Sequence, residues 1–440
     1  MLSPASSNTD AIRKRLRSRS RYEIANNSYA KGMIVTMANE VIGTGPRLQF
    51  GSEYDDVNDA VERRWREWMD STRLAEKLRT AFMATVGDGE GIVKLFENEF
   101  ADPQGVQLDA EPIETDRLDS EGDFSVAENA IEYDRSGRPT VYKILREHPG
   151  DLLVTDPRGR DRVPAQYVLH MFRADRPGQL RGVPWITPAL GLFAQLRRYT
   201  AATLAAAETA ANLAAVLESP APADTEDMAD PWVEVPIEKN TFTTLPAGTK
   251  LSQLKAEQPT AMYGDFKNEI IKEIARCLGI PFNVAAGNSG GMNYSSGRLD
   301  YQNWYRTLRV LRADLELMLD RIFGMWFAEA VLIPGYIPEI PKADFPIDHA
   351  WYWDGAEYID PLKEAKADET RLLAGMLSRS EYFARRGLDW SKEMRQIAKE
   401  KKMMADLGLD YSPQPAAPMA PNDPLLDQED PVPAGANENK

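Results

Sequence analysis

Cysteine and histidine are scarce in this 440-residue sequence, which contains one cysteine and three histidines. The single cysteine, Cys277, excludes an intrachain disulfide and is typical of proteins that stay in a reducing compartment. His148, His170 and His349 are far apart and belong to no HExxH or cysteine-paired motif. We therefore expect structural roles for the histidines and no metal site.

Long apolar runs and an excess of positive charge are also absent. No run reaches the roughly 20 apolar residues that a membrane-spanning helix needs, and the first residues lack the apolar core of a secretion signal. The net charge of −16 argues against a surface that clamps nucleic acid or an anionic membrane, although DNA as a transient guest is not excluded. We therefore expect a cytoplasmic protein with no membrane partner.

Helical and alternating patterns occupy separate stretches, which predicts an α+β fold of two or three domains. Helices are predicted at 57–70, 72–86, 188–218, 260–279 and 297–331, with three more after residue 360. Alternation between residues 91 and 172 predicts the hairpins of a small antiparallel β domain, and a short strand is expected near 348–354. Residues 412–440 are rich in proline and are expected to be disordered.

The N-terminal segment carries the basic run "RKRLRSRSR" at 13–21. Ser20 and Glu23 have the spacing of a capping box, which predicts a helix from about Tyr22 to Gly43. The basic run is either a solvated helix or an arm that grips an acidic neighbour or nucleic acid. Its candidate contact residues are Arg13, Lys14, Arg15, Arg17, Arg19 and Arg21.

The predicted helix at 188–218 is unusually rich in alanine, with eleven alanines between Ala189 and Glu218. Alanine favours the helix but offers few large side chains for a core. Such a helix suits close packing between other helices, in a bundle or in a ring of protomers. An acidic stretch follows, with seven carboxylates and no basic residue between Glu218 and Glu238.

A loop rich in glycine, serine and asparagine, "AAGNSGGMNYSSGRLD" at 285–300, separates two patterned helices. It follows a helix and contains no lysine, so neither a P-loop nor a dinucleotide-binding turn fits, and no cofactor is expected. An uncharged flexible loop can touch a passing polymer without reading bases, as a gate or brake would. The residues expected to make such contacts are Asn288, Ser289, Gly290, Gly291, Met292, Asn293 and Tyr294.

One stretch raises the alternative of an enzyme. In "WYWDGAEYID" at 351–360, Asp354 and Glu357 could serve as the acid/base pair of a carbohydrate-active hydrolase. The structural interpretation makes Trp351 and Trp353 core anchors and Asp360 a helix N-cap. A monomeric cytoplasmic adaptor with an acidic tail is a third hypothesis.

Three long stretches resemble signature regions of the lambda-type portal proteins of tailed bacteriophages. They are "YVLHMFRADRPGQLRGVPWITPAL" (167–190), "LGIPFNVAAGNSGGMNYSSGRLDY" (278–301) and "WYWDGAEYIDPLKEAKADE" (351–369), and residues 20–49 are similar to the N-terminal region of that family. The resemblance implies a wing of helices and strands, a two-helix stem, a small clip that contains strands, and a helical crown. In this sequence these regions correspond to a basic arm (1–21), wing (22–187), first stem helix (188–217), clip (218–261), second stem helix (262–284), channel loop (285–297), wing helix and strand (298–359), crown (360–411) and tail (412–440).

The resemblance also implies a function that involves no catalysis. Such proteins form a ring, usually of twelve copies, at one capsid vertex, through which double-stranded DNA is packaged and ejected. The implied partners are the large terminase subunit, capsid and scaffold proteins and head–tail connector proteins, and the implied locations are the virion and, during assembly, the bacterial cytoplasm. Candidate clip contacts to a basic partner are Asp224, Glu226, Asp227 and Asp230.

Overall fold

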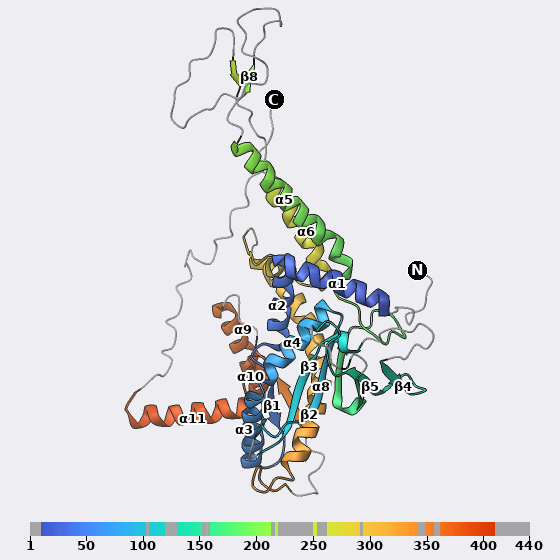
Figure 1. Ribbon diagram of the computed structural model, residues 1–440. Coiled ribbons are helices and arrows are strands. Elements are labelled where there is room, and N and C mark those ends of the chain that lie inside the picture. The colour runs from blue at the N-terminus through green and yellow to red at the C-terminus, as the bar shows by residue number, and fades with distance from the viewer. Residues whose placement is uncertain are drawn as a thin grey trace, which may run out of the picture. The chain divides into compact units, whose positions relative to one another are not determined.

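The computed structural model describes residues 10–102, 105–118, 130–151, 156, 159–212, 216–218, 250–252, 262–290, 294–340, 348–355 and 361–409. The chain divides into two units, Met1–Asp360 and Pro361–Lys440. Helices and strands are mixed among the described residues (Figure 1), as the α+β prediction requires.

The N-terminal helix begins earlier than predicted. Helix α1 (Asp10–Asn26) includes the whole basic run, and Ser20 is buried in its middle, where the hydroxyl donates a hydrogen bond to the Gly87 carbonyl. The capping-box prediction at Ser20 is therefore wrong. The cap is Asn27, whose side chain accepts hydrogen bonds from two backbone N–H groups and starts α2 (Ser28–Ile42).

Two predicted helices of the first unit are confirmed as α3 (Asp55–Ser71) and α4 (Leu74–Gly87). An aromatic cluster joins α3 to α8 (Tyr294–Ala330), since the rings of Trp65 and Trp326 meet edge to face with 5.3 Å between centroids. Aromatic side chains of this size account for much of the apolar area that a core buries. The cluster lies in one continuous hydrophobic core of the unit.

The strands form small antiparallel sheets. One has the order β3–β2–β7, from β2 (Glu90–Glu97), β3 (Leu108–Ile113) and β7 (Val168–Phe172). Another has the order β4–β5–β6, from β4 (Ile131–Tyr133), β5 (Pro139–Leu145) and β6 (Arg160–Pro164). The predicted β4–β5 hairpin is confirmed, whereas β7 pairs with the distant β2.

A third pairing joins segments far apart in the sequence. Strand β1 (Arg47–Phe50) pairs antiparallel with β10 (His349–Tyr352), the strand predicted near residue 349. This pair brings the start of the unit beside its end.

The alanine-rich helix is shorter than predicted. Helix α5 (Leu190–Asn212) ends before residue 216, and β8 (Val216–Glu218) pairs antiparallel with β9 (Lys250–Ser252). The prediction of helix through residue 218 is therefore wrong, because these last residues pair with a strand instead. Helix α6 (Met262–Leu278) packs against α5, and Figure 1 shows the two side by side.

The second unit consists, in its described part, of α9 (Pro361–Leu373), α10 (Arg379–Ala384) and α11 (Trp390–Asp406). Ser378 caps α10, since its hydroxyl accepts a hydrogen bond from the Glu381 N–H. Asp389 caps α11 in the same way. The predicted cap at Asp360 and the predicted disordered tail lie outside the described residues.

Candidate functional site

The loop between α6 and α8 is shorter than predicted, because residues 282–286 form a short helix. The predicted stop after α6 is confirmed at Gly279, which has a φ of 70°. Helix α7 (Phe282–Ala286) follows and ends at Gly287, whose φ of 62° disfavours any residue with a Cβ. The loop proper therefore spans residues 287–293.

The described part of this loop is exposed and uncharged. Residues 287–290 are all exposed, and Asn288 stabilises the turn because its Oδ1 accepts a hydrogen bond from the Gly290 N–H at 2.8 Å. Gly291, Met292 and Asn293 lie outside the described residues, and so does the side chain of Tyr294, the first residue of α8. The loop therefore presents polar, uncharged groups to its surroundings in the part that is described.

The α7 end of the loop is held by buried side chains. Asn283 and Ala285 of α7 are buried, and α7 packs against α2. At the other end, residues 296–303 of α8 are exposed or half-buried, and the buried stripe of α8 begins at Trp304. The described turn at residues 287–290 is thus exposed and is anchored on the side of α7.

The α5–α6 pair is held together by aromatic rings. The Tyr199 ring stacks on Tyr263 at 5.5 Å between centroids and meets Phe266 edge to face at 4.9 Å. Phe266 lies in helical register with the buried Ile270 and Ile274, but 51% of its own surface is exposed. On α5, Leu204 is 60% exposed and several alanines beside it are exposed as well.

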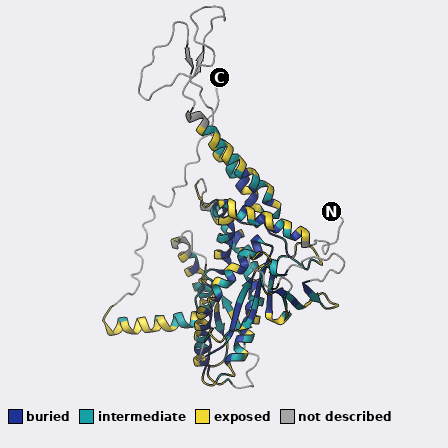
Figure 2. Ribbon diagram, viewed as in Figure 1, coloured by how far each residue is buried: buried dark blue, intermediate teal, exposed yellow. Residues whose placement is uncertain are grey.

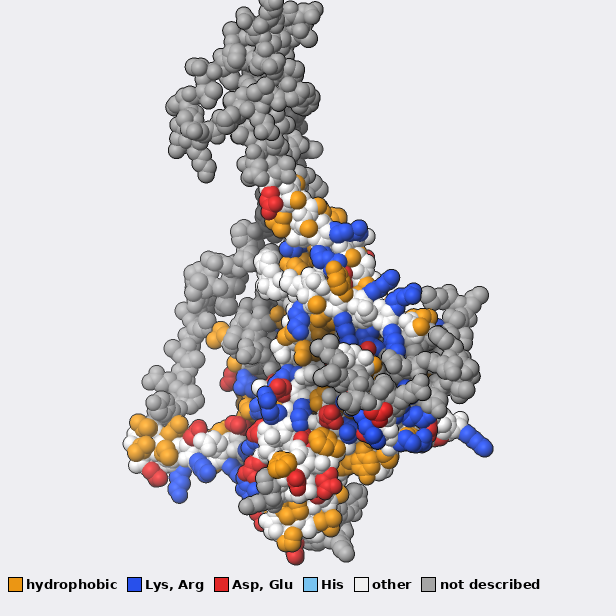
Figure 3. All heavy atoms as spheres, in the orientation of Figure 1, with side chains coloured by type: hydrophobic (Ala, Val, Ile, Leu, Met, Phe, Trp, Pro, Cys, Tyr) orange, Lys and Arg blue, Asp and Glu red, His pale blue; other side chains and the backbone are white. Residues whose placement is uncertain are grey.

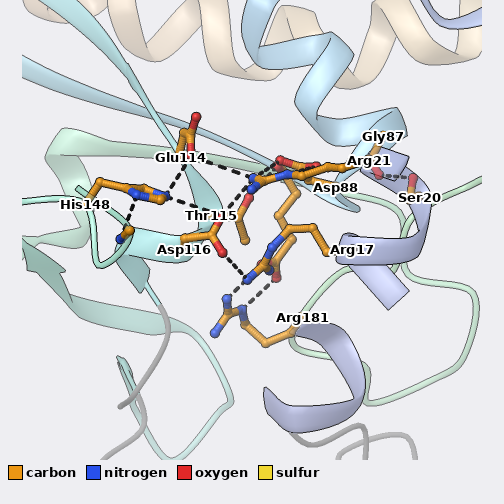
Figure 4. A network of polar contacts seen from close by, with 12 residues as sticks. Arg17, Ser20, Arg21, Gly87, Asp88, Glu114, Thr115, Asp116, His148 and Arg181 are labelled. Atoms are coloured by element: carbon orange, nitrogen blue, oxygen red, sulfur yellow. Dashed lines mark hydrogen bonds and ion pairs between the residues drawn. The ribbon is translucent and has the colours of Figure 1, made fainter. Parts of the chain in front are cut away.

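One face of the basic run on helix α1 forms ion pairs with acidic residues of the same chain (Figure 4). The Arg17 guanidinium lies 2.9 Å from an Asp116 oxygen, and Arg21 contacts Asp88 at 2.6 Å and Asp116 at 2.7 Å. Burial raises the pKa of Asp116, but the charges of Arg17 and Arg21 lower it more, so it lies below its usual range. These contacts anchor α1 to the β domain.

The remaining basic residues of α1 face outward. Arg15 and Arg19 are exposed and Lys14 is half-buried, whereas only 8% of the surface of Arg13 is exposed. The predicted basic arm is therefore an ordered helix. The basic residues of its outer face are Lys14, Arg15 and Arg19. A partner for this face stays a prediction.

A possible cation-binding group adjoins this anchor. Glu114, Asp116 and His148 each offer a ligand atom, and these atoms lie within 4.8 Å of one another. Sequence spacing did not reveal the group, because its members are brought together by the fold. Arg21 already neutralises Asp116 at 2.7 Å, so the group serves the anchor of α1 as an ion-pair cluster.

A second buried network holds the loop that follows β7. The Glu90 carboxylate, with only 1% of its surface exposed, accepts two hydrogen bonds from Arg181, at 2.6 and 2.7 Å, and one from the Gly182 N–H. Burial raises the pKa of Glu90, but the Arg181 charge and His170 lower it further, so it lies well below its usual range. Glu90 thus fixes the loop to the sheet.

Asp354 has a structural position. Its two oxygens accept hydrogen bonds from the Thr44 N–H at 2.6 Å and the Thr44 hydroxyl at 2.8 Å, at the end of α2. Trp353 is buried, as the structural interpretation predicted, and its indole donates to Glu316. Glu357 lies outside the described residues, as do all four clip candidates, Asp224, Glu226, Asp227 and Asp230.

The comparison with protein families decides the identity of the chain. Residues 1–312 match the model of the phage portal protein, lambda family. The chain belongs to the lambda family of phage portal proteins. The match covers α1 through the middle of α8, and so includes the α5–α6 pair and the loop after α7.

Individual proteins are also similar to this chain. The portal chain is 24% identical over 426 residues to the probable portal protein of Halomonas phage phiHAP-1. The aligned region covers 90% of this chain and 81% of that protein. A chain in the virion of a native gene transfer agent (GTA) particle is 14% identical, with a TM-score of 0.49 over 85% of this chain and 93% of that one. A chain in the neck of a native GTA particle, computed with C12 symmetry, is 16% identical, with a TM-score of 0.48 over 84% of this chain and 92% of that one.

Among the described helices of this portal protein, none combines the length and the apolar character that a membrane-spanning segment requires.

Proposed function

We propose that this portal protein assembles into a ring that encloses a channel for double-stranded DNA. Membership of the portal family carries the proposal. In this proposal the α5–α6 pair is the stem and residues 287–293 belong to the channel loop predicted at 285–297. Strand β9 falls in the predicted clip, whereas β8 spans the predicted border between stem and clip. In this proposal many copies stand side by side and each contributes one loop to the channel.

The exposed surface of the α5–α6 pair supports contact between copies. Leu204 and Phe266 expose more than half of their surfaces, and the alanines of α5 permit close approach of a neighbouring helix. Burying such apolar area contributes about 25 cal/mol per Å². We propose that these helices pack against the same pair in adjacent copies.

The charge of the chain supports a conduit that releases its cargo. Each phosphate that a lysine or arginine neutralises adds affinity through counterion release, and accumulated affinity would stop the polymer. A chain with a net charge of −16 and an uncharged exposed turn at residues 287–290 avoids most of this affinity. The loop would follow the duplex with weak contacts only.

The partners and location follow from this role. We propose that a terminase docks on the clip and supplies ATP hydrolysis, because the portal family is structural and this sequence has no Walker motif. Capsid, scaffold and connector proteins would bind the other surfaces, including the outer face of α1. The assembled ring would remain in the virion after assembly in the host cytoplasm.

Native mass spectrometry of the purified full-length chain tests the ring. We expect one closed assembly, of about twelve copies, and the mass of this single species gives the number of copies directly. A protein that stays monomeric at micromolar concentrations, under conditions where a known portal assembles, would contradict the proposal and favour the adaptor hypothesis.

A further inference from the structure

Helix α11 separates its side chains into two opposite faces. Trp390, Met394, Ile397 and Met404 lie on one side at helical spacing, and the last three are half-buried. Helix α10 packs against α11. This apolar face is suited to packing against other protein segments. The opposite side of the helix is then left exposed.

The opposite side of α11 carries a row of positive charge, the basic ridge, which consists of Lys392, Arg395, Lys399 and Lys402. Their spacing of i, i+3, i+7 and i+10 puts all four on one face over roughly 15 Å of helix. Arg395, Lys399 and Lys402 are exposed and Lys392 is half-buried. Figure 2 shows α11 exposed over much of its length, and Figure 3 shows blue Lys and Arg side chains projecting from it.

Acidic residues are kept mostly to a different side of α11. Glu393 and Glu400 lie between the apolar face and the ridge, and Asp406 lies at the end of the ridge. Residues 361–409 contain eleven Lys and Arg against eight Asp and Glu, a local charge of +3 in a chain of −16. The helical part of the second unit is thus opposite in sign to the chain as a whole.

A polyanion of high charge density fits such a ridge. Double-stranded DNA carries one negative charge per about 1.7 Å of its axis, and lysine and arginine are its usual phosphate contacts. We propose that the basic ridge of α11 binds the phosphate backbone of double-stranded DNA without recognising bases. This inference rests on the proposed function, in which the portal ring surrounds DNA.

An acidic protein surface fits the ridge less well than DNA does. The centres of protein interfaces are rich in aromatic and apolar side chains and poor in lysine, because those residues supply the affinity. The ridge contains three lysines and one arginine, and Trp390, Met394, Ile397 and Met404 lie on the opposite face. One exposed apolar side chain, Met403, lies beside Lys399 at the edge of the ridge. A surface that is mainly charge, with one apolar residue at its edge, suits a polymer that must slide.

In this proposal the ridge holds the DNA by electrostatic attraction at one position along the conduit. Repeated in every copy of a ring, it would hold the duplex through charge at α11, while the uncharged loop at 287–293 contributes little affinity. Each neutralised phosphate adds about 0.9 to the steepness with which the binding constant falls with salt. DNA retention by the portal is therefore expected to weaken with salt.

Fluorescence anisotropy tests the ridge with the full-length assembled protein and a labelled duplex of mixed sequence, about 30 base pairs long. We expect the double variant Lys399→Gln and Lys402→Gln to bind about tenfold more weakly at low salt. Its plot of log affinity against log salt should be less steep by about 2 for each copy whose ridge contacts the duplex, and the loss should be the same for duplexes of unrelated sequence.

The matched control is the double variant Lys401→Gln and Arg66→Gln, which removes two exposed positive charges away from the ridge. We expect it to bind the duplex as the unchanged protein does. Equal affinity and equal salt dependence of the ridge variant and the unchanged protein would overturn the proposal. So would normal DNA binding by the ridge variant together with lost binding of polyglutamate, which would assign the ridge to an acidic protein.

Native mass spectrometry of the same samples separates this inference from the ring itself. If every variant forms the same ring and the ridge variant still binds DNA normally, the ridge proposal fails and the conduit stands. If the unchanged protein forms no ring, the conduit fails, whatever the DNA affinity of α11.

Discussion

At the residue scale, Glu90 is the point where the sheet, a histidine and a distant loop meet. The carboxylate is almost fully buried, and Arg181, 91 positions away in the sequence, donates two hydrogen bonds to it. A buried charge is tolerated only when it is paired, because burial removes its hydration. The loop that contains Arg181 is therefore fixed by this one carboxylate.

We expect Glu90→Gln to lower the free energy of local opening around β2 by about 3–5 kcal/mol, because the largely buried Arg181 loses the counter-charge of Glu90. Hydrogen exchange of β2 and of residues 173–185 measures the effect within the assembled protein. The control is Glu111→Gln, whose carboxylate is 40% exposed in its ion pairs with Lys94 and Arg117. An exposed pair contributes about 0–1 kcal/mol, so equal effects of both variants would contradict the assigned role of Glu90.

The same residue gives a pH dependence with a defined sign. The pKa of Glu90 is depressed in the folded chain relative to its ordinary value of 4.5. Its contribution to stability is therefore complete above that value and is lost as the pH falls toward the folded pKa. Protection of β2 from exchange should decrease below pH 4.5 in the unchanged protein and stay flat in Glu90→Gln.

At the element scale, the loop after α7 combines an anchored start with an exposed turn at residues 287–290. The Gly290 N–H donates to Asn288, and proline at this position would remove the donor and fix φ. We expect Gly290→Pro with Gly291→Pro to leave assembly intact, because residues 287–290 are exposed, and to block DNA packaging or retention.

An in vitro packaging assay with purified heads measures this effect, with native mass spectrometry as the check on assembly. Gly290→Ala keeps the N–H group and is the control that should package normally. Normal packaging by the double proline variant would remove the gating role from the loop.

Elements with a strong local pattern were predictable from the sequence. The buried stripe of α8, which includes Trp304, Leu308, Leu315 and Trp326, follows the helical period, and Ser378 caps α10 through a contact three residues long. Both signals lie within a few residues of one another, so local physical chemistry determines them.

Elements that depend on distant partners were not predictable in this way. Helix α1 begins before the basic run because Arg17 and Arg21 face the protein, where Asp88 and Asp116 neutralise them. Arginines on a buried face hide the apolar period on which helix prediction depends. The pairing of β7 with β2 was missed for the same reason, since no local pattern encodes a partner strand.

In the candidate site, too, features set by local sequence were predictable, whereas features formed by distant residues were not. The sequence identified the exposed turn at 288–290 from its composition, and the structure places this turn between α7 and α8. The sequence did not reveal the cluster of Glu114, Asp116 and His148, whose members come together only in the fold. The sequence predicted the helix that became α11, but the basic ridge was not identified until the structure showed which of its residues are exposed.

At the scale of the whole molecule, charge is distributed unevenly in a way that suits a conduit. The net charge is −16, yet residues 361–409 carry a net charge of +3, and the outer face of α1 is basic. The negative net charge disfavours DNA binding by the chain as a whole, and in the described part of the chain the ridge of α11 and the outer face of α1 are the two basic faces identified. One of these we assign to DNA, and the other stays open to a protein partner.

Electron cryomicroscopy of the assembled protein with DNA threaded through it tests the central claim most directly. The account predicts a closed ring of identical copies around the duplex, with residues 287–293 of each copy at the wall of the axial opening. A closed assembly in which these residues lie away from the duplex, or copies that bind DNA without surrounding it, would contradict the account.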